Sequence, residues 1–128
     1  MKVEIGGTAV SRLSRREIAA FVRSVLRAAR GNIAELSIAF VDDATMRALN
    51  RQFRRKDKTT DVLTFPDEIV ISIEQARRQA RDEKHSLATE VRYLIVHGVL
   101  HALGYDHEND EGEMNELELR VRRRVGLA

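Results

Sequence analysis

The stretch that decides the fold runs from Ser86 to His107 and reads S-L-A-T-E-V-R-Y-L-I-V-H-G-V-L-H-A-L-G-Y-D-H. Its apolar side chains recur at helical spacing, so we predict a buried helix over Ser86–Leu103 with Ser86 as its N-cap. The side chains expected to face the core are Leu87, Val91, Leu94, Ile95, Val99 and Leu103. Gly104 follows, where helices often end in a left-handed residue that glycine adopts easily. The sequence therefore predicts a central helix on which other elements pack.

Three of the four histidines lie within this stretch. His97 and His101 are four residues apart, which places them on the same face of a helix. A turn at Gly104 can then bring His107 to the same point. Three neutral imidazoles with one open position are typical of a catalytic zinc site, whereas structural zinc sites usually close with four protein ligands. We predict one zinc ion per chain, held by His97, His101 and His107, although imidazole ligands also suit copper, nickel and iron.

The histidine spacing matches the protease signature H-E-x-x-H-x-x-G-x-x-H at every position but one. The glutamate that acts as the general base in those proteases is replaced by Gly98. A metallopeptidase-like hydrolase therefore remains an alternative, which the spacing favours and Gly98 opposes. The fourth histidine, His85, lies in the polar run R-D-E-K-H-S, and we expect it to be solvated.

Length and composition limit the class of protein. The chain has 128 residues and no cysteine, so we predict a single domain over residues 1–128 without disulfides or thiolate metal ligands. The N-terminus lacks the apolar core of a signal peptide, and no apolar run approaches the length of a membrane span. We expect a soluble, cytoplasmic protein with no membrane partner.

Charge is distributed unevenly along the chain. Residues 1–64 contain 13 Lys/Arg and 7 Asp/Glu, giving +6, whereas residues 65–128 contain 9 and 13, giving −4. The basic excess is greatest at R-Q-F-R-R-K-D-K, residues 51–58, and such a patch can attract a polyanion such as RNA. An ordinary solvated helix end is the alternative. The RNA-binding candidates in this patch are Arg51, Arg55, Lys56 and Lys58.

Periodicity and turn residues predict alternating strands and helices. Ser14 and Glu17 form a capping box that begins one helix, and Gly31 follows its end. The predicted strands are 2–5, 36–41, 61–65 and 69–73, and the predicted helices are 14–30, 43–53, 74–84, 86–103 and 110–124. The fold class is α+β, with one small mixed sheet of about four strands packed with about five helices. The metal site lies on the central helix and the turn after it.

Two segments together resemble a known family. The first is N-R-Q-F-R-R-K-D-K-T-T-D-V-L-T-F-P at 50–66, and the second is E-V-R-Y-L-I-V-H-G-V-L-H-A-L-G-Y-D-H at 90–107. Both are similar to motifs of the YbeY endoribonucleases, bacterial ribosomal-RNA maturation factors. The segment M-N-E-L-E at 114–118 also resembles the M-x-x-x-E that follows in this family.

The resemblance implies a zinc-dependent, single-strand-specific endoribonuclease acting in 16S rRNA 3′-end maturation and ribosome quality control. Its implied partners are ribosomal RNA and the ribosome or small-subunit proteins, and no DNA is expected. By motif match, His97, His101 and His107 are the zinc ligands, and Arg54 falls on a functionally important arginine. We expect Arg54 to neutralise charge developing on the phosphorane, because a guanidinium binds phosphate oxygens bidentately. Holding the RNA backbone is its alternative role.

The sequence departs from the family pattern at three places. Thr59 replaces the usual proline, which is expected to loosen one turn. Thr64 replaces the usual serine and keeps the hydroxyl. The connection from Pro66 to Ile69 is shorter than the family's, and we predict that it borders the site.

The general base stays open at the level of sequence. The candidate carboxylates are Asp61, Glu68 and Asp106, besides zinc-activated water and the RNA 2′-hydroxyl. Glu90 lies seven residues before His97 and could orient a ligand. A ribosome-binding factor with a structural zinc is a further alternative, since it would explain the basic patch without chemistry.

Overall fold

The computed structural model describes residues 2–106 and 111–127. Four strands form one mixed sheet in the order β1-β2-β4-β3, with β1, β2 and β4 parallel and β3 antiparallel to β4. The strands are β1 (Lys2–Gly7), β2 (Glu35–Val41), β3 (Val62–Phe65) and β4 (Glu68–Ser72). The helices are α1 (Arg15–Ala28), α2 (Asp43–Arg54), α3 (Ile73–Asp82), α4 (Leu87–Ala102) and α5 (Glu113–Arg124). The predicted α+β class is confirmed.

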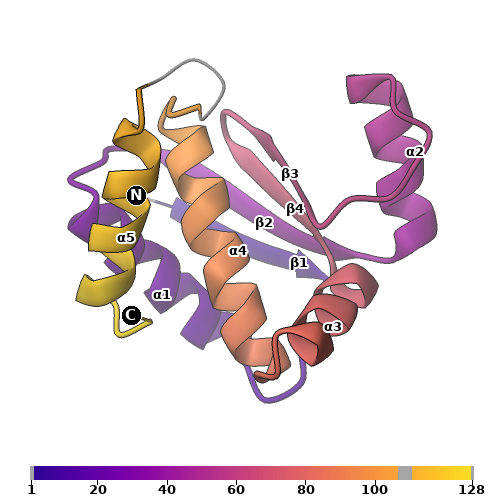
Figure 1. Cartoon of the computed structure of the whole chain (residues 1–128), viewed down its shortest axis with the longest axis horizontal. Helices are drawn as coiled ribbons and strands as arrows, with labels where there is room; N and C mark the ends of the chain where they lie inside the picture. Colours follow the sequence, from indigo (N-terminus) through magenta and orange to yellow (C-terminus); the bar gives the residue numbers. More distant parts are fainter. Residues whose placement is uncertain (1, 107–110, 128) are drawn as a thin grey trace.

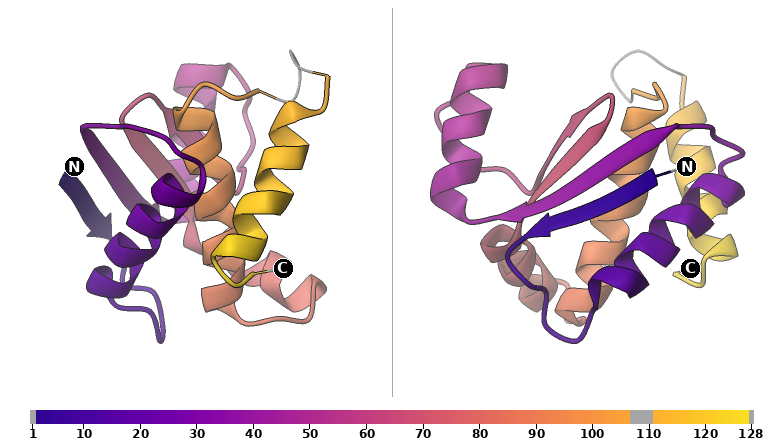
Figure 2. Two further views of the ribbon diagram at one scale, coloured as in Figure 1. Left: turned by 90° about the vertical axis from the view of Figure 1, so that its left-hand side faces the viewer. Right: turned by 180° about the vertical axis from the view of Figure 1, so that it is seen from behind.

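The two faces of the sheet are covered unequally. Helices α1, α4 and α5 gather on one side, whereas α2 stands apart beyond the β3–β4 hairpin (Figure 1). Seen from behind, β1 and β2 cross in front of α4, which places the sheet and α4 in adjacent layers (Figure 2). The main core lies in this interface, where Ile69 and Ile71 of β4 pack with Ile95 and Val99 of α4. No helix among the described residues is long and apolar enough to cross a membrane.

The opposite face of the sheet carries a smaller core under α2. Met46 of α2 is fully buried there against Leu63 and Val70. Leu49 packs at the edge of this cluster, but Phe53 is 53% exposed. At the last turn of α2 the ring of Phe53 packs edge to face against Phe65, with centroids 5.3 Å apart.

Local signals set most helix boundaries. The capping box of Ser14 and Glu17 begins α1, and Ser86 caps α4 by accepting a hydrogen bond from the backbone N–H of Thr89. Two boundaries differ from the prediction. The left-handed residue after α1 is Arg30 (φ 53°), one residue before Gly31, and α5 begins at Glu113 rather than near residue 110. Among the described residues no side chain caps the first turn of α5, whose N-cap is Gly112 in a left-handed conformation (φ 104°).

Candidate metal and RNA site

An open cleft of about 620 Å³ lies where α2, β3 and the end of α4 meet. One part of its wall comes from α2, the α2–β3 loop and β3, and the other from α4 and the turn that follows. The lining residues are Asn50, Arg54, Lys56, Lys58, Thr60, Asp61, Val62, Leu63, Thr64, His97, His101, Gly104, Tyr105 and Asp106. The cleft thus brings together the two sequence segments that carried the chemistry.

The two helical histidines converge as their spacing predicted. The Nε2 atoms of His97 and His101 lie 3.0 Å apart, and the rings meet edge to face with centroids 4.6 Å apart. Two imidazole nitrogens directed at one point suit a single metal ion, which fits the zinc prediction. The third predicted ligand, His107, lies outside the described residues. Within residues 2–106 and 111–127, no three metal-binding side chains of His, Cys, Asp or Glu gather.

A carboxylate from α5 holds the ring of His97. The distance from His97 Nδ1 to Glu118 Oε1 is 2.8 Å, and Arg122 donates to the other Glu118 oxygen at 2.7 Å. Since an ionised carboxylate can only accept hydrogen bonds, Nδ1 carries the proton and Nε2 has the lone pair that a metal needs. Sequence reasoning missed this role, although Glu118 lies in the M-N-E-L-E segment that resembles the family.

Gly98 faces the sheet rather than the cleft. A Cβ atom built on Gly98 would lie 2.9 Å from Cγ2 of Ile69, a residue of β4 with no exposed surface. A side chain at this position therefore cannot be accommodated without displacing the sheet. In the matching protease signature this position holds the glutamate that acts as the base. Here Gly98 instead lets α4 pack closely against β4.

Arg54 lies in the cleft wall, at the C-terminal end of α2. Its Nη2 donates to the backbone carbonyl of Thr64 at 3.2 Å, which ties the guanidinium to the edge strand β3. Among residues 2–106 and 111–127, its other N–H groups have no hydrogen-bond acceptor. The structure thus places Arg54 in the same cleft as His97 and His101.

The four other basic candidates separate into two groups. Lys56 and Lys58 line the cleft, whereas Arg51 and Arg55 are exposed and do not. The difference arises because Arg55 adopts a left-handed conformation (φ 58°) that ends α2 and turns the chain toward β3. The basic loop is tied to α2: Asn50 Nδ2 donates to the Lys58 carbonyl at 2.9 Å.

Asp43 anchors the same loop from its other end. Its Oδ1 accepts hydrogen bonds from Ser72 Oγ at 2.8 Å and Thr59 Oγ1 at 3.2 Å, and Arg78 pairs with its Oδ2 at 2.8 Å. Partial burial alone would raise the pKa of Asp43, but the hydrogen bonds from Ser72, Arg78 and Thr59 outweigh it and hold this pKa below its usual value. Thr59, expected to loosen the turn, makes a hydrogen bond that the family's proline could not make.

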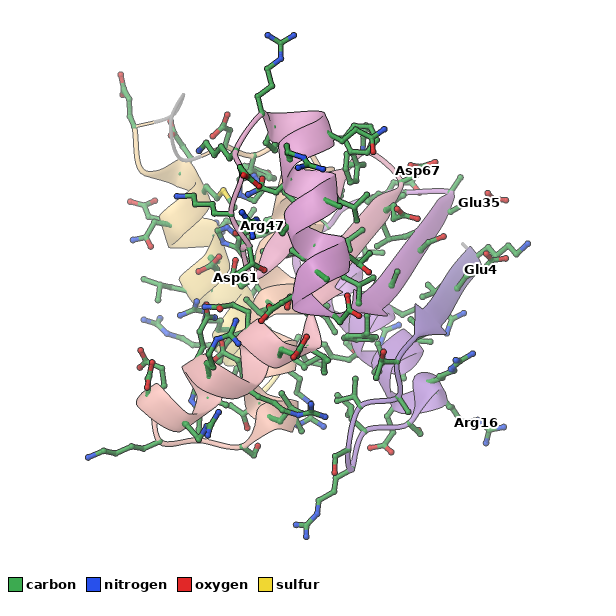
Figure 3. The ribbon with its side chains drawn as sticks, turned by 90° about the vertical axis from the view of Figure 1, so that its right-hand side faces the viewer. Glu4, Arg16, Glu35, Arg47, Asp61 and Asp67 are labelled. Carbon is green, nitrogen blue, oxygen red and sulfur yellow. The ribbon has the colours of Figure 1, made fainter. Side chains whose placement is uncertain are left out.

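The three carboxylates that the sequence offered as a general base do not all lie in the cleft. Asp61 and Asp106 line the cleft, and Glu68 does not. Figure 3 shows Asp61 beside the loop that leaves α2, on the same side of the molecule as Arg47. Asp61 already accepts hydrogen bonds from the Val62 N–H at 2.8 Å and from Gln79 Nε2 at 3.3 Å.

Glu90 does not orient a zinc ligand, contrary to the prediction. Two helical turns separate it from His97, and its buried carboxylate instead accepts from Gln79 at 2.9 Å and pairs with His85 Nε2 at 2.6 Å. His85 was expected to be solvated, but its side chain is only 25% exposed because the contact with Glu90 and the ring of Tyr93 hold it.

The short Pro66–Ile69 connection forms the turn of the β3–β4 hairpin. Phe65 pairs directly with Glu68, so only Pro66 and Asp67 separate the strands. None of the turn's residues lines the cleft, so the statement that this segment borders the site stays a prediction. Thr64 does line it, so the hydroxyl that replaces the usual serine is retained at the site.

Comparison with known proteins identifies the family. The profile described as "Endoribonuclease YbeY" matches residues 7–126, which is nearly the whole chain. The chain belongs to the YbeY endoribonuclease family. The match confirms the resemblance seen in the two motifs.

Curated relatives named "Endoribonuclease YbeY" agree with this assignment. The chain is 44% identical over 102 residues to the protein of Nautilia profundicola, covering 73% of each chain. It is 50% identical over 91 residues to that of Solibacter usitatus, covering 66% of this chain and 62% of the relative. The Aquifex aeolicus protein is 48% identical over 101 residues, covering 68% and 67%.

A solved structure supports the YbeY-type fold. The solution structure of a Thermotoga maritima protein superposes with a TM-score of 0.66 at 26% identity, covering 96% of this chain and 88% of that one. The superposition therefore includes the sheet, α4 and the elements that form the cleft.

Proposed function

We propose that this chain is a zinc-dependent endoribonuclease specific for single-stranded RNA, which matures the 3′ end of 16S rRNA and acts in ribosome quality control. Membership of the YbeY endoribonuclease family supports RNA cleavage. The observation that carries the proposal is the shared cleft, in which two histidines with Nε2 atoms 3.0 Å apart lie with Arg54, Lys56 and Lys58. Metal-binding nitrogens and phosphate-binding cations in one open groove suit the cleavage of a polyanion.

The proposed zinc ligands are His97, His101 and His107, with one ion per chain. When bound, zinc lowers the pKa of a water molecule and neutralises negative charge on a phosphoryl oxygen. Glu118 fixes the ring of His97 so that Nε2 is directed to the metal. The His97 side chain is 32% exposed at the cleft wall, so a substrate phosphate can approach the site.

Arg54 is the proposed catalytic cation. Its bond to the Thr64 carbonyl fixes the guanidinium in the cleft, and its remaining N–H groups can donate to two phosphate oxygens. Charge on those oxygens increases as the phosphorane forms, so a fixed cation stabilises the transition state more than the bound RNA. Lys56 and Lys58 would hold the neighbouring phosphates, and Asp61 and Asp106 are the cleft carboxylates within reach of a transferred proton.

The cellular part of the proposal follows from the motifs at 50–66 and 90–107. We place the enzyme in the cytoplasm, with ribosomal RNA and small-subunit proteins as partners, and expect no activity on DNA. Two other functions are weaker. A metallopeptidase-like hydrolase would need a base that Gly98 cannot supply. An extended peptide substrate would pair with the free edge of β3, but Arg54 already donates a hydrogen bond to the Thr64 carbonyl on that edge. A structural zinc would be enclosed by protein ligands, unlike this open cleft.

The deciding experiment incubates RNA and casein separately with wild-type protein and with the His101→Ala and Arg54→Ala variants, with and without a chelator. We expect the wild type to cleave RNA but not casein, and both variants and the chelator to abolish most of that cleavage. Arg16→Ala is the matched control, because Arg16 lies on α1, well away from Asp61 (Figure 3). Intact RNA after incubation with folded, zinc-loaded wild type would refute the nuclease.

Metal content and substrate form test the finer statements. Zinc analysis should return about one equivalent from the wild type and from His85→Ala, and much less from His101→Ala. Less than about half an equivalent in the wild type would refute the zinc site. An RNA with an unprocessed 16S 3′ end should be cut when single-stranded and protected when annealed to its complement. Equal cleavage of both forms would contradict strand specificity.

A further inference from the structure

We propose that Tyr105 is a stacking platform for an unpaired base of the RNA strand, and that it underlies the preference for single strands. The inference rests on the proposed function and adds to it a recognition element for the base. It follows from three properties of Tyr105: its exposure, its fixed backbone and its place beside phosphate-binding cations.

The exposure of Tyr105 is not explained by the packing of the chain. Three large apolar side chains are exposed in the described structure, namely Phe53, Tyr105 and Leu119. Of these only Tyr105, which is 37% exposed, lines the cleft. Its hydroxyl has no hydrogen-bond partner within residues 2–106 and 111–127, whereas the other tyrosine, Tyr93, donates to the Leu127 carbonyl at 2.9 Å.

The backbone at Tyr105 is held in place by the end of α4. Gly104 adopts a left-handed conformation (φ 101°), the Gly104 N–H donates to the His101 carbonyl at 2.9 Å, and the Tyr105 N–H donates to the Leu100 carbonyl at 3.1 Å. These bonds close the helix and fix the start of the Tyr105 side chain one residue after the turn. A platform held in this way loses little conformational entropy when a base stacks on it.

The cations of the α2–β3 loop lie in the same cleft as this ring. Lys56 and Lys58 can hold the sugar-phosphate backbone, and the Asn50–Lys58 bond keeps their loop in position. Proteins that bind single strands combine a basic groove with aromatic rings on which bases stack. In a duplex the bases are already stacked and paired, so Tyr105 can contact only an unpaired base.

The test is a binding measurement by fluorescence anisotropy on zinc-loaded protein. The first probe is a labelled pentanucleotide whose riboses are 2′-O-methylated to prevent cleavage through the 2′-hydroxyl. The second is the same strand with abasic sugars. A gel run after each titration checks that the probe is still intact. Tyr105→Leu should bind the base-containing probe about 5- to 150-fold more weakly than the wild type and the abasic probe with less than about twofold change. Tyr105→Phe keeps the ring and should bind like the wild type. Leu119→Ala, which truncates an apolar side chain that is 44% exposed outside the cleft, is the matched control.

Three outcomes would overturn the role of Tyr105 while leaving the nuclease intact. The first is unchanged binding of the base-containing probe by Tyr105→Leu. The second is an equal loss for both probes, which would assign the effect to the RNA backbone. The third is an equal loss in Tyr105→Phe, which would assign it to the hydroxyl. A wild type that neither binds nor cleaves RNA would instead refute the proposed function, and with it this inference.

Discussion

Glu118 and His97 come from different helices and meet through a 2.8 Å contact between a carboxylate oxygen and Nδ1. Glu118 is only 7% exposed, and its second oxygen is neutralised by Arg122. A buried carboxylate so placed increases the electron density on the ring and fixes its orientation. The zinc affinity of the proposed site therefore depends on Glu118, a residue that is not among the predicted ligands.

We predict that Glu118→Gln lowers zinc affinity about 10- to 100-fold without unfolding the protein, because the amide orients His97 less firmly. Competition with a chromophoric chelator measures the affinity, and circular dichroism checks the fold. Glu116→Gln is the control, since Glu116 is exposed on the same helix. Equal zinc affinity in the wild type and Glu118→Gln would show that the contact does not support the metal.

Gly98→Ala is predicted to destabilise the fold by about 1–2 kcal/mol, despite the higher helix propensity of alanine. The added methyl would lie 2.9 Å from Cγ2 of Ile69, and this β-branched side chain is buried and cannot swing away. Urea unfolding measures the change. Gly6→Ala is the matched control, because nothing lies within 4 Å of its added methyl. A Gly98→Ala protein at least as stable as the wild type would contradict the predicted clash.

The loop network of Asp43 predicts a pH-dependent stability. Its pKa in the folded protein lies below the usual value, so its contribution is complete above the unfolded pKa of about 3.9 and disappears as the pH falls through the folded pKa. Asp43→Asn should cost about 1–2 kcal/mol at pH 7, from hydrogen bonds to a charged group, and progressively less below about pH 4. Unfolding curves from pH 7 to 3 measure the difference.

Asp82→Asn provides the comparison for this effect, because Asp82 is exposed at the end of α3. Its substitution should change stability by less than about 0.5 kcal/mol over the same range. A pH-independent gap between wild type and Asp43→Asn would mean that the charge of Asp43 does not matter.

Lys56 and Lys58 are predicted to contact RNA phosphates rather than bases. Replacing either by glutamine should weaken binding to all single-stranded sequences alike and reduce the slope of log K against log salt by about 0.7. Anisotropy titrations at several salt concentrations give this slope. Lys84→Gln, an exposed lysine outside the cleft, should leave it unchanged. A sequence-dependent loss, or an unaltered slope, would argue against phosphate contacts.

Much of this architecture was predictable because its signals are local. Ser14 with Glu17, Ser86 and Gly104 set helix boundaries within a few residues of themselves, and two histidines four residues apart share a helix face whatever surrounds them. Contacts between distant segments were not predictable. Glu118 reaches His97 across 21 residues and Asp43 reaches Ser72 across 29, distances over which periodicity carries no information.

Contacts between distant segments also decide the role of Glu90 and the position of the β3–β4 turn. The suggestion that Glu90 could orient a zinc ligand assumed that a shared helix face implies contact, although two turns of helix separate Glu90 from His97 by about 10 Å. The short hairpin turn follows directly on a motif in the sequence, yet none of its residues lines the cleft. The partners of Glu90 and the position of this turn are set by tertiary packing.

The two walls of the cleft belong to two separate stretches of chain. Asn50 to Thr64 supplies the wall that carries the basic side chains, and His97 to Asp106 supplies the wall that carries the two helical histidines. Lys56 and Lys58 are exposed and lie on the first of these stretches, so their substitution changes one wall at its surface. A chimera that exchanges only residues 55–60 for those of a relative would therefore alter the proposed RNA contacts of Lys56 and Lys58 while keeping Arg54 and the two helical histidines, and would separate RNA binding from cleavage.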